Sequence, residues 1–156
     1  MSLNWYAIKV YFNRTAAVCD QLCRQGIELY RQDVIPSYVF LHCTKEQMAS
    51  IRQTLWEQAF VYCTPDRKEA APISEKEMSV FMLVTSMGAN GLEYLGDDKA
   101  EYHTGDLVRV TAGPFEGAVG HIKRIKRDRK LIVSINGVAA VAVAHIPSQL
   151  LEKVQR

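Results

Sequence analysis

Short apolar runs and helical stripes alternate through the first half of the chain. Residues 5–12 form an aromatic and β-branched run that predicts a buried strand, and residues 38–43 form a second one. Residues 60–63 are a shorter strand candidate that ends at a Thr-Pro-Asp turn. Between these runs, apolar residues recur every three or four positions, as on one face of a helix. The pattern therefore predicts strands that alternate with amphipathic helices.

Capping residues mark where three helices begin. Asn13 is placed to cap the first helix, and Gly26 supplies its left-handed stop. In the other two helices a hydroxyl residue is followed three residues later by Gln or Glu, the spacing of a capping box. These pairs are Thr44 with Gln47 and Ser74 with Glu77. The order of strands and helices predicts an α+β sandwich, in which helices pack on a small antiparallel sheet.

The second half of the chain has a different pattern. Four short strand candidates, separated by Gly, Pro or charged turns, occupy residues 107–110, 118–125, 131–135 and 140–146. Regular short strands with such turns predict a small all-β barrel. Residues 88–101 lack a sustained period and are interpreted as a linker, in which residues 93–95 could pair with a sheet edge. The expected domains are therefore residues 1–87 and 102–156, joined by this linker.

Composition excludes several classes of protein. A chain of 156 residues with 48% hydrophobic side chains can bury one ordinary core or two small ones. Its apolar stretches are all shorter than the roughly 20 residues that cross a bilayer, and residues 1–9 have no secretory signal, so we expect a cytoplasmic protein without membrane contact. The cysteines at positions 19, 23, 43 and 63 include no C-x2-C pair. They are interpreted as structural thiols, and no metal or cofactor is expected.

Catalysis is not expected either. A catalytic triad needs a nucleophile with a base held beside it. The histidines at positions 42, 103, 121 and 145 show no local spacing that pairs them with Ser, Cys or a carboxylate. The sequence therefore favours a binding protein over an enzyme.

Charge is distributed unevenly along the chain. Residues 1–101 carry ten basic against thirteen acidic side chains, whereas residues 102–156 carry nine against four. Six cations lie close together at a turn between two expected strands: Lys123, Arg124, Lys126, Arg127, Arg129 and Lys130. Such a cluster suits phosphate contacts, but a solvated hairpin turn explains it equally well because no aromatic residue is interleaved to stack on bases.

Residues 105–120 (GDLVRVTAGPFEGAVG) contain the most specific motif in the chain. Gly105 turns the chain into a strand, and Gly113 with Pro114 forms a tight loop that presents Phe115. This stretch resembles the KOW motif of NusG proteins and of several ribosomal proteins. The glycines are explained by the turns and close packing that a barrel needs. An aromatic side chain at a loop tip is different, because it is costly to expose unless it packs or binds. Pro114 and Phe115 are therefore candidates for binding a partner of the KOW domain.

Three segments of the first half resemble the N-terminal domain of NusG proteins. They are Trp5 with Tyr6, residues 35–40 (IPSYVF) and residues 71–77 (APISEKE). Together with the KOW motif, the resemblance to the NusG-like family of transcription elongation and antitermination factors covers nearly the whole chain.

The resemblance implies a partner for the first domain. In this family it docks on the clamp helices of the largest RNA polymerase subunit, and the matching positions here are Ile35, Pro36 and Tyr38, with Tyr6 nearby. Ile35 stands where the family has Phe, Ser37 stands where it has Gly or Asn, and residues 27–34 are a shortened form of a longer segment. Core packing is an equal alternative for Tyr38.

The resemblance also implies contacts for the rest of the molecule. Arg14 and Arg24 on the first helix would approach the displaced DNA strand, and the KOW domain would recruit a ribosomal protein or a termination factor. The short middle segment favours a specialised, operon-type paralogue that acts as a monomer. The alternative is an RNA-binding or ribosome-associated KOW protein that acts through its basic hairpin.

Overall fold

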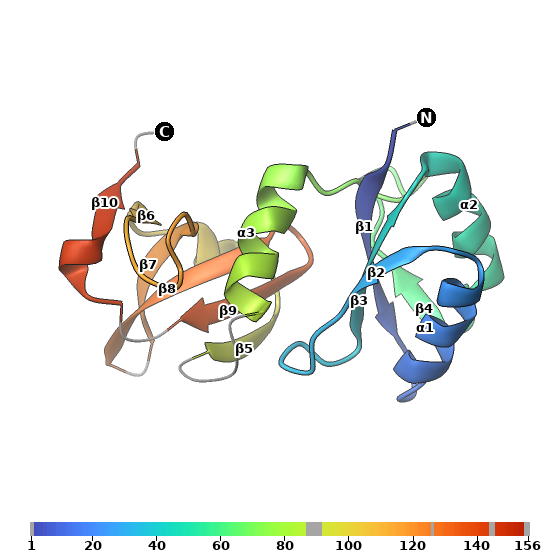
Figure 1. Cartoon of the computed structure of the whole chain (residues 1–156), viewed down its shortest axis with the longest axis horizontal. Helices are drawn as coiled ribbons and strands as arrows, with labels where there is room; N and C mark the ends of the chain where they lie inside the picture. The colour runs from blue at the N-terminus through green and yellow to red at the C-terminus, as the bar shows by residue number, and fades with distance from the viewer. Residues whose placement is uncertain (1, 87–91, 126, 144–145, 155–156) are drawn as a thin grey trace. The chain divides into compact units, whose positions relative to one another are not determined.

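The computed structural model describes residues 2–86, 92–125, 127–143 and 146–154. The chain folds into two compact units, Met1–Glu75 and Lys76–Arg156. Figure 1 shows both units, and each is considered by itself below.

The first unit is built on a four-stranded antiparallel sheet. Its strands are β1 (Asn4–Val10), β2 (Glu28–Tyr30), β3 (Tyr38–Cys43) and β4 (Ala59–Val61), in the order β2-β3-β1-β4. In the central pair, Tyr6 lies opposite Leu41 and Lys9 lies opposite Tyr38. Because successive side chains point to opposite faces, this register decides which residues share a face.

Two helices cover one face of this sheet: α1 (Thr15–Arg24) and α2 (Lys45–Thr54), as Figure 1 shows. The buried stripe of α1 is Val18, Cys19 and Leu22, and that of α2 is Met48 and Ile51. These side chains form one apolar cluster with β1, β3 and β4 side chains such as Ile8, Leu41 and Val61. The predicted α+β sandwich is therefore confirmed, with its core between the sheet and this helical layer.

The predicted helix ends are partly confirmed. Thr44 and Gln47 form the full capping box of α2, and Gly26 adopts the left-handed conformation at φ 78° after α1. The predicted cap at Asn13 is wrong, because Arg14 occupies the cap position and no side chain bonds there. Phe12 and Asn13 both have φ 57°, so Asn13 is used in the turn that reverses the chain after β1.

The second unit consists mainly of a six-stranded antiparallel sheet in the order β10-β6-β7-β8-β9-β5. The strands are β5 (Leu92–Asp97), β6 (Leu107–Val110), β7 (Val119–Ile125), β8 (Asp128–Ile135), β9 (Ala139–Val143) and β10 (Leu151–Lys153). Short 3-10 helices occupy Ala100–His103 and Ser148–Leu150. The four predicted strands correspond to β6, β7, β8 and β9, although residues 144–145 of the last prediction lie outside the described residues, and they confirm the expected all-β second half.

Two segments join the two halves of the chain. Helix α3 (Glu75–Ser86) enters the second unit after its first residue, and Glu77 accepts a hydrogen bond there from the amide of Asn136 at 2.9 Å. Residues 92–97 form β5 and pair with β9 at the edge of the sheet, which confirms the expectation that residues 93–95 could pair with a sheet edge. The expected domains, residues 1–87 and 102–156, are defined by their separate functions. The two compact units are defined by contacts, so the domain bounds stay a prediction.

Glycines permit close strand packing in the second unit. A Cβ on Gly120 would overlap the carbonyl oxygen of Ile132 on the neighbouring strand, and one on Gly105 would overlap the carbonyl oxygen of Ile122. Gly105 also has φ 86°, which L side chains rarely adopt. These two glycines are therefore required by the fold itself.

Among the described residues, no helix is long and apolar enough to span a membrane. Over the same residues, no group of three or more His, Cys, Asp or Glu side chains is arranged to hold a metal ion.

Candidate interaction surfaces

The sheet of the first unit has a face opposite α1 and α2 that is rich in aromatic side chains. Lys9 of β1 lies opposite both Tyr38 of β3 and Phe60 of β4, so the three side chains share this face. Tyr62, two residues after Phe60, points the same way. We call Lys9, Tyr38, Phe60 and Tyr62 the aromatic face.

Ring contacts hold these side chains in a fixed arrangement. The rings of Tyr38 and Tyr62 stack with centroids 6.2 Å apart, and Phe60 meets Tyr62 edge-on at 4.9 Å. The Tyr62 hydroxyl donates a hydrogen bond to the Tyr38 hydroxyl at 3.4 Å. The Lys9 ammonium lies 5.3 Å from the Tyr38 ring centroid, a cation–π distance. Each such contact contributes about 0.5–1.5 kcal/mol, so the face is preorganised.

Exposure changes across the aromatic face. Tyr38 is only 1% exposed, whereas Phe60 is 48% exposed. Nearby at the end of β1, Tyr11 is also exposed, and its amide bonds the carbonyl oxygen of Gln58 just before β4. An exposed ring seated on fixed buried rings is a suitable anchor for a partner protein.

A second ring stack lies farther along the same face. The rings of Trp5 and His42 are 4.6 Å apart and nearly parallel. His42 Nδ1 lies 3.1 Å from Glu28, and its Nε2 lies 3.3 Å from Glu75. The hydrogen bond between Nδ1 and Glu28 orients the imidazole ring over the indole, whereas the Nε2 contact with Glu75 is a distance without hydrogen-bond geometry.

The predicted polymerase-binding residues divide between the two faces. Ile35 and Tyr38 are buried and joined by a turn, in which the Tyr38 amide bonds the Ile35 carbonyl at 3.4 Å, and Pro36 is exposed on that turn. Tyr6 instead lies opposite Leu41 in the helix-covered core, where burial raises the pKa of its hydroxyl. The structure therefore brings Ile35, Pro36 and Tyr38 together and places Tyr6 on the other side of the sheet.

Sequence reasoning missed Lys9, Phe60 and Tyr62. The signal was available, because residues of equal parity in a strand share a face. Trp5, Ala7 and Lys9 follow that rule in β1. Assigning Tyr38 to their face required the register between β1 and β3, and that register became known only from the structure.

The two arginines proposed for nucleic-acid contact lie at opposite ends of α1. Arg14 is the N-cap residue and Arg24 is in the last turn, and both are exposed. They are ten positions apart, which corresponds to a rise of roughly 15 Å along the helix. They could contact separate phosphates but do not form one site.

Intramolecular contacts engage part of the basic hairpin between β7 and β8. The Lys123 ammonium donates to the Glu101 carbonyl oxygen at 2.7 Å, and Lys130, 13% exposed, pairs with Glu93 at 2.8 Å. The exposed cations are Arg124, Arg127 and Arg129, and Arg124 lies directly opposite Arg129. Lys126 is outside the described residues.

The predicted partner loop of the second unit is a tight turn. The Glu116 amide bonds the Gly113 carbonyl at 3.1 Å, and the Ala118 amide bonds the Phe115 carbonyl at 2.9 Å. Pro114 is exposed and Phe115 is partly buried. The loop therefore exposes the proline ring more than the phenyl ring.

Comparisons with known proteins agree with this two-part architecture. Residues 104–136 match the KOW motif. The chain is 25% identical to the transcription termination/antitermination protein NusG of Deinococcus radiodurans, over 88% of this chain and 93% of that protein. Its fold is similar to the solved structure of Thermotoga maritima NusG, with a TM-score of 0.55, 19% identity and 99% of both chains covered.

Proposed function

We propose that this chain, which carries a KOW motif and is similar to NusG proteins, is a transcription elongation or antitermination factor. In this proposal the first unit binds elongating RNA polymerase on the clamp helices of its largest subunit. The second unit recruits another factor. The chain works as a cytoplasmic monomer without catalytic activity.

The aromatic face is the observation that supports polymerase binding most directly. The turn at residues 35–38 places exposed Pro36 beside Tyr38, and the ring contacts of Tyr62 hold exposed Phe60 in position. A helix pair docking on a sheet needs such a rigid apolar anchor. Tyr38 and Ile35 act as positioning residues beneath the contact, because both are buried.

The loop with Pro114 and Phe115 is the proposed contact of the second unit. Its partner is a ribosomal protein or a termination factor. Joining two binding modules in one chain raises the effective concentration of the second module once the first is bound. This tethering lets a weak KOW contact act at the polymerase.

Suppression of pausing or termination requires contacts near the nucleic acid. Exposed Arg14 and Arg24 are the proposed contacts of the first unit with the displaced DNA strand. The short segment at residues 27–34, which contains only the three-residue strand β2, supports a specialised, operon-type paralogue.

A second candidate function has its own supporting observation. Arg124, Arg127 and Arg129 are exposed at the β7–β8 hairpin and could contact phosphates. An RNA-binding or ribosome-associated protein would depend on these arginines rather than on the aromatic face, and its affinity would fall steeply with salt.

Binding to core RNA polymerase tests the proposal. The full chain is compared with Phe60→Ala and with a variant in which Arg124, Arg127 and Arg129 are changed to Ser. We expect Phe60→Ala to weaken binding at least tenfold, because it removes the exposed anchor, and the arginine variant to bind nearly as the wild type does. Phe12→Ala, which removes an exposed ring outside the aromatic face, is the matched control.

The opposite result selects the second candidate. If the wild type does not bind polymerase but binds RNA through the three arginines, the elongation-factor proposal is wrong.

A further inference from the structure

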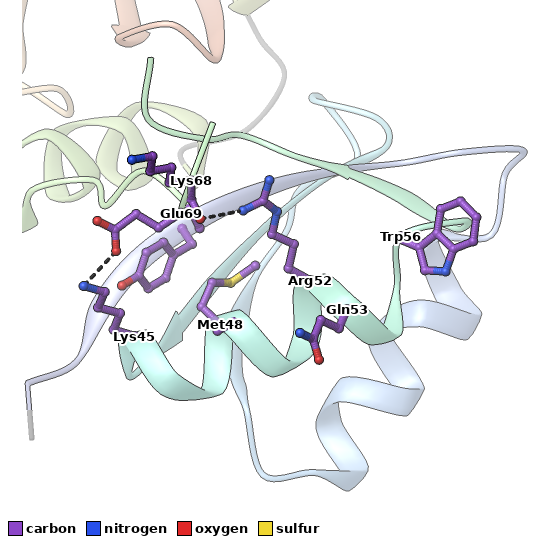
Figure 2. A pocket seen from close by; sticks show the side chains of 10 residues that line it. Lys45, Met48, Arg52, Gln53, Trp56, Lys68 and Glu69 are labelled. Carbon is purple, nitrogen blue, oxygen red and sulfur yellow. Dashed lines mark hydrogen bonds and ion pairs between the residues drawn. The ribbon is translucent and has the colours of Figure 1, made fainter. Parts of the chain in front are cut away.

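A groove runs along the outer side of α2 in the first unit, on the helix-covered side of the sheet. It has a volume of about 660 Å³ and lies between α2 and residues 68–70. Figure 2 shows Lys45, Met48, Arg52 and Trp56 following one another along the helix, with Lys68 and Glu69 on the opposite wall. Its floor includes Tyr6, Met48 and Ala70. The groove is thus separate from the aromatic face, which lies on the other side of the sheet.

Hydrogen bonds fix the opposite wall of the groove. The Arg52 guanidinium donates to the carbonyl oxygens of Lys68 at 3.2 Å and Arg67 at 3.0 Å. Lys45 pairs with Glu69 at 2.7 Å, a contact that raises the pKa of the Lys45 ammonium. The groove is therefore formed before any ligand arrives, which reduces the entropy cost of binding.

The turn that carries this wall is also stabilised internally. The Thr64 hydroxyl donates to Asp66 at 2.6 Å, and the Lys68 amide donates to the same carboxylate at 3.0 Å. These two bonds lower the pKa of Asp66. The Lys68 side chain takes no part in them, so it can change without loss of this turn.

One end of the groove is formed by an exposed indole. Trp56 follows the last residue of α2 by two positions and is 70% exposed. Tryptophan is the side chain that contributes most often to binding energy at protein interfaces. A well-formed groove that ends at such a ring has the form of a binding site for an apolar anchor.

The charge of the groove selects the type of ligand. Three cations line it, Lys45, Arg52 and Lys68, against one carboxylate, Glu69. A single-stranded nucleic acid is disfavoured, because it binds best to a row of exposed rings, and Trp56 is the single largely exposed ring among the lining residues. An acidic side chain of a peptide can instead reach Lys68, whereas Lys45 is already paired with Glu69.

We propose that this groove binds a short acidic segment of a partner protein. One apolar side chain of the segment packs on Trp56, and a carboxylate of the segment pairs with Lys68. From residue 45 to residue 56 the helix is roughly 16 Å long, which fits about five residues of extended peptide. The site is a second protein contact of the first unit, and it does not depend on polymerase binding.

Selection of peptides on the full-length chain tests this site. The probe is a pool of random peptides of about six residues made from Asp, Glu, Leu, Phe and Gly. The control pool has Lys and Arg in place of the acidic residues. Binding of selected peptides is measured by titration calorimetry for every variant, and also by tryptophan emission for the variants that keep Trp56. Trp5, the other tryptophan, is buried against His42, so a blue shift reports loss of water around Trp56.

The expected result is selection from the acidic pool alone, with binding weakened at least tenfold by Lys68→Glu and by Trp56→Ala. Lys76→Glu and Phe12→Ala make the same changes at exposed residues outside the groove and should leave affinity within about twofold. Equal binding of both pools, or affinity unchanged by Lys68→Glu, would overturn the proposal. So would tighter binding of a thymidine oligonucleotide that competes with the peptides and depends on Trp56.

Discussion

The two faces of the first unit's sheet are made by alternating residues of the same strands, yet they carry different chemistry. On the helix-covered face, aliphatic side chains such as Ile8 and Leu41 are fully buried in one cluster with α1 and α2. On the aromatic face, Tyr38, Tyr62 and Phe60 form ring contacts, and Phe60 remains half exposed. The first arrangement is suited to stability and the second to recognition, so substitutions on the two faces should have separable effects.

Thiol reactivity should show the largest contrast. Cys43 is buried on the helix-covered face, where burial raises its pKa to about 11, whereas Cys23 on the outside of α1 is exposed. A reagent such as a nitrobenzoate disulfide should therefore label Cys23 at least about 1,000-fold faster than Cys43, because Cys43 becomes accessible only on unfolding. Mass spectrometry of partly labelled protein measures both rates.

The raised pKa of Cys43 also fixes a pH dependence. The unfolded chain ionises this thiol near its usual value of 9 and the folded chain at about 11, so the contribution to stability is complete below pH 9 and is lost as pH rises towards 11. A Cys43→Ala variant should lack this part of the pH dependence. Rapid labelling of Cys43 in folded protein would show that the core is not closed.

Truncation in the core should have the next largest effect. Leu41→Ala removes a fully buried side chain from the cluster shared with α1 and α2, and we expect it to lower the free energy of unfolding by about 2–5 kcal/mol. Urea denaturation followed by circular dichroism measures this loss. A loss below about 1 kcal/mol would mean that the two faces do not differ as described.

The division between the faces also explains what the sequence could and could not predict. Apolar runs located β1 and β3, and the capping box at Thr44 located α2, because these signals are local. The placement of Tyr6 required the strand register, which depends on contacts between residues far apart in the chain. The same limit applies to α3, whose position in the second unit depends on contacts such as Glu77 with Asn136.

A hydroxyl pair on the aromatic face should make a smaller contribution. Tyr38→Phe removes the acceptor of the 3.4 Å hydrogen bond from Tyr62 and keeps the ring stack. The expected loss is about 1 kcal/mol or less, since the bond is long. Tyr62→Phe and the double variant complete a cycle that isolates the pair, and a coupling of zero would show that the rings alone hold the face together.

The smallest effect on stability is expected at the edge of the aromatic face. Phe60 contacts Tyr62 edge-on but keeps 48% of its surface in water, so Phe60→Ala should change the free energy of unfolding by about 1 kcal/mol or less. Leu41→Ala, two strands away, is the matched truncation on the other face, and both are measured by the same urea titration. If Phe60→Ala destabilised the protein as strongly as Leu41→Ala, Phe60 would belong to the folding core, and a loss of polymerase binding could not be attributed to contact. A nearly unchanged stability together with weakened binding would assign this ring to recognition, because the loss of binding could then not come from loss of the fold.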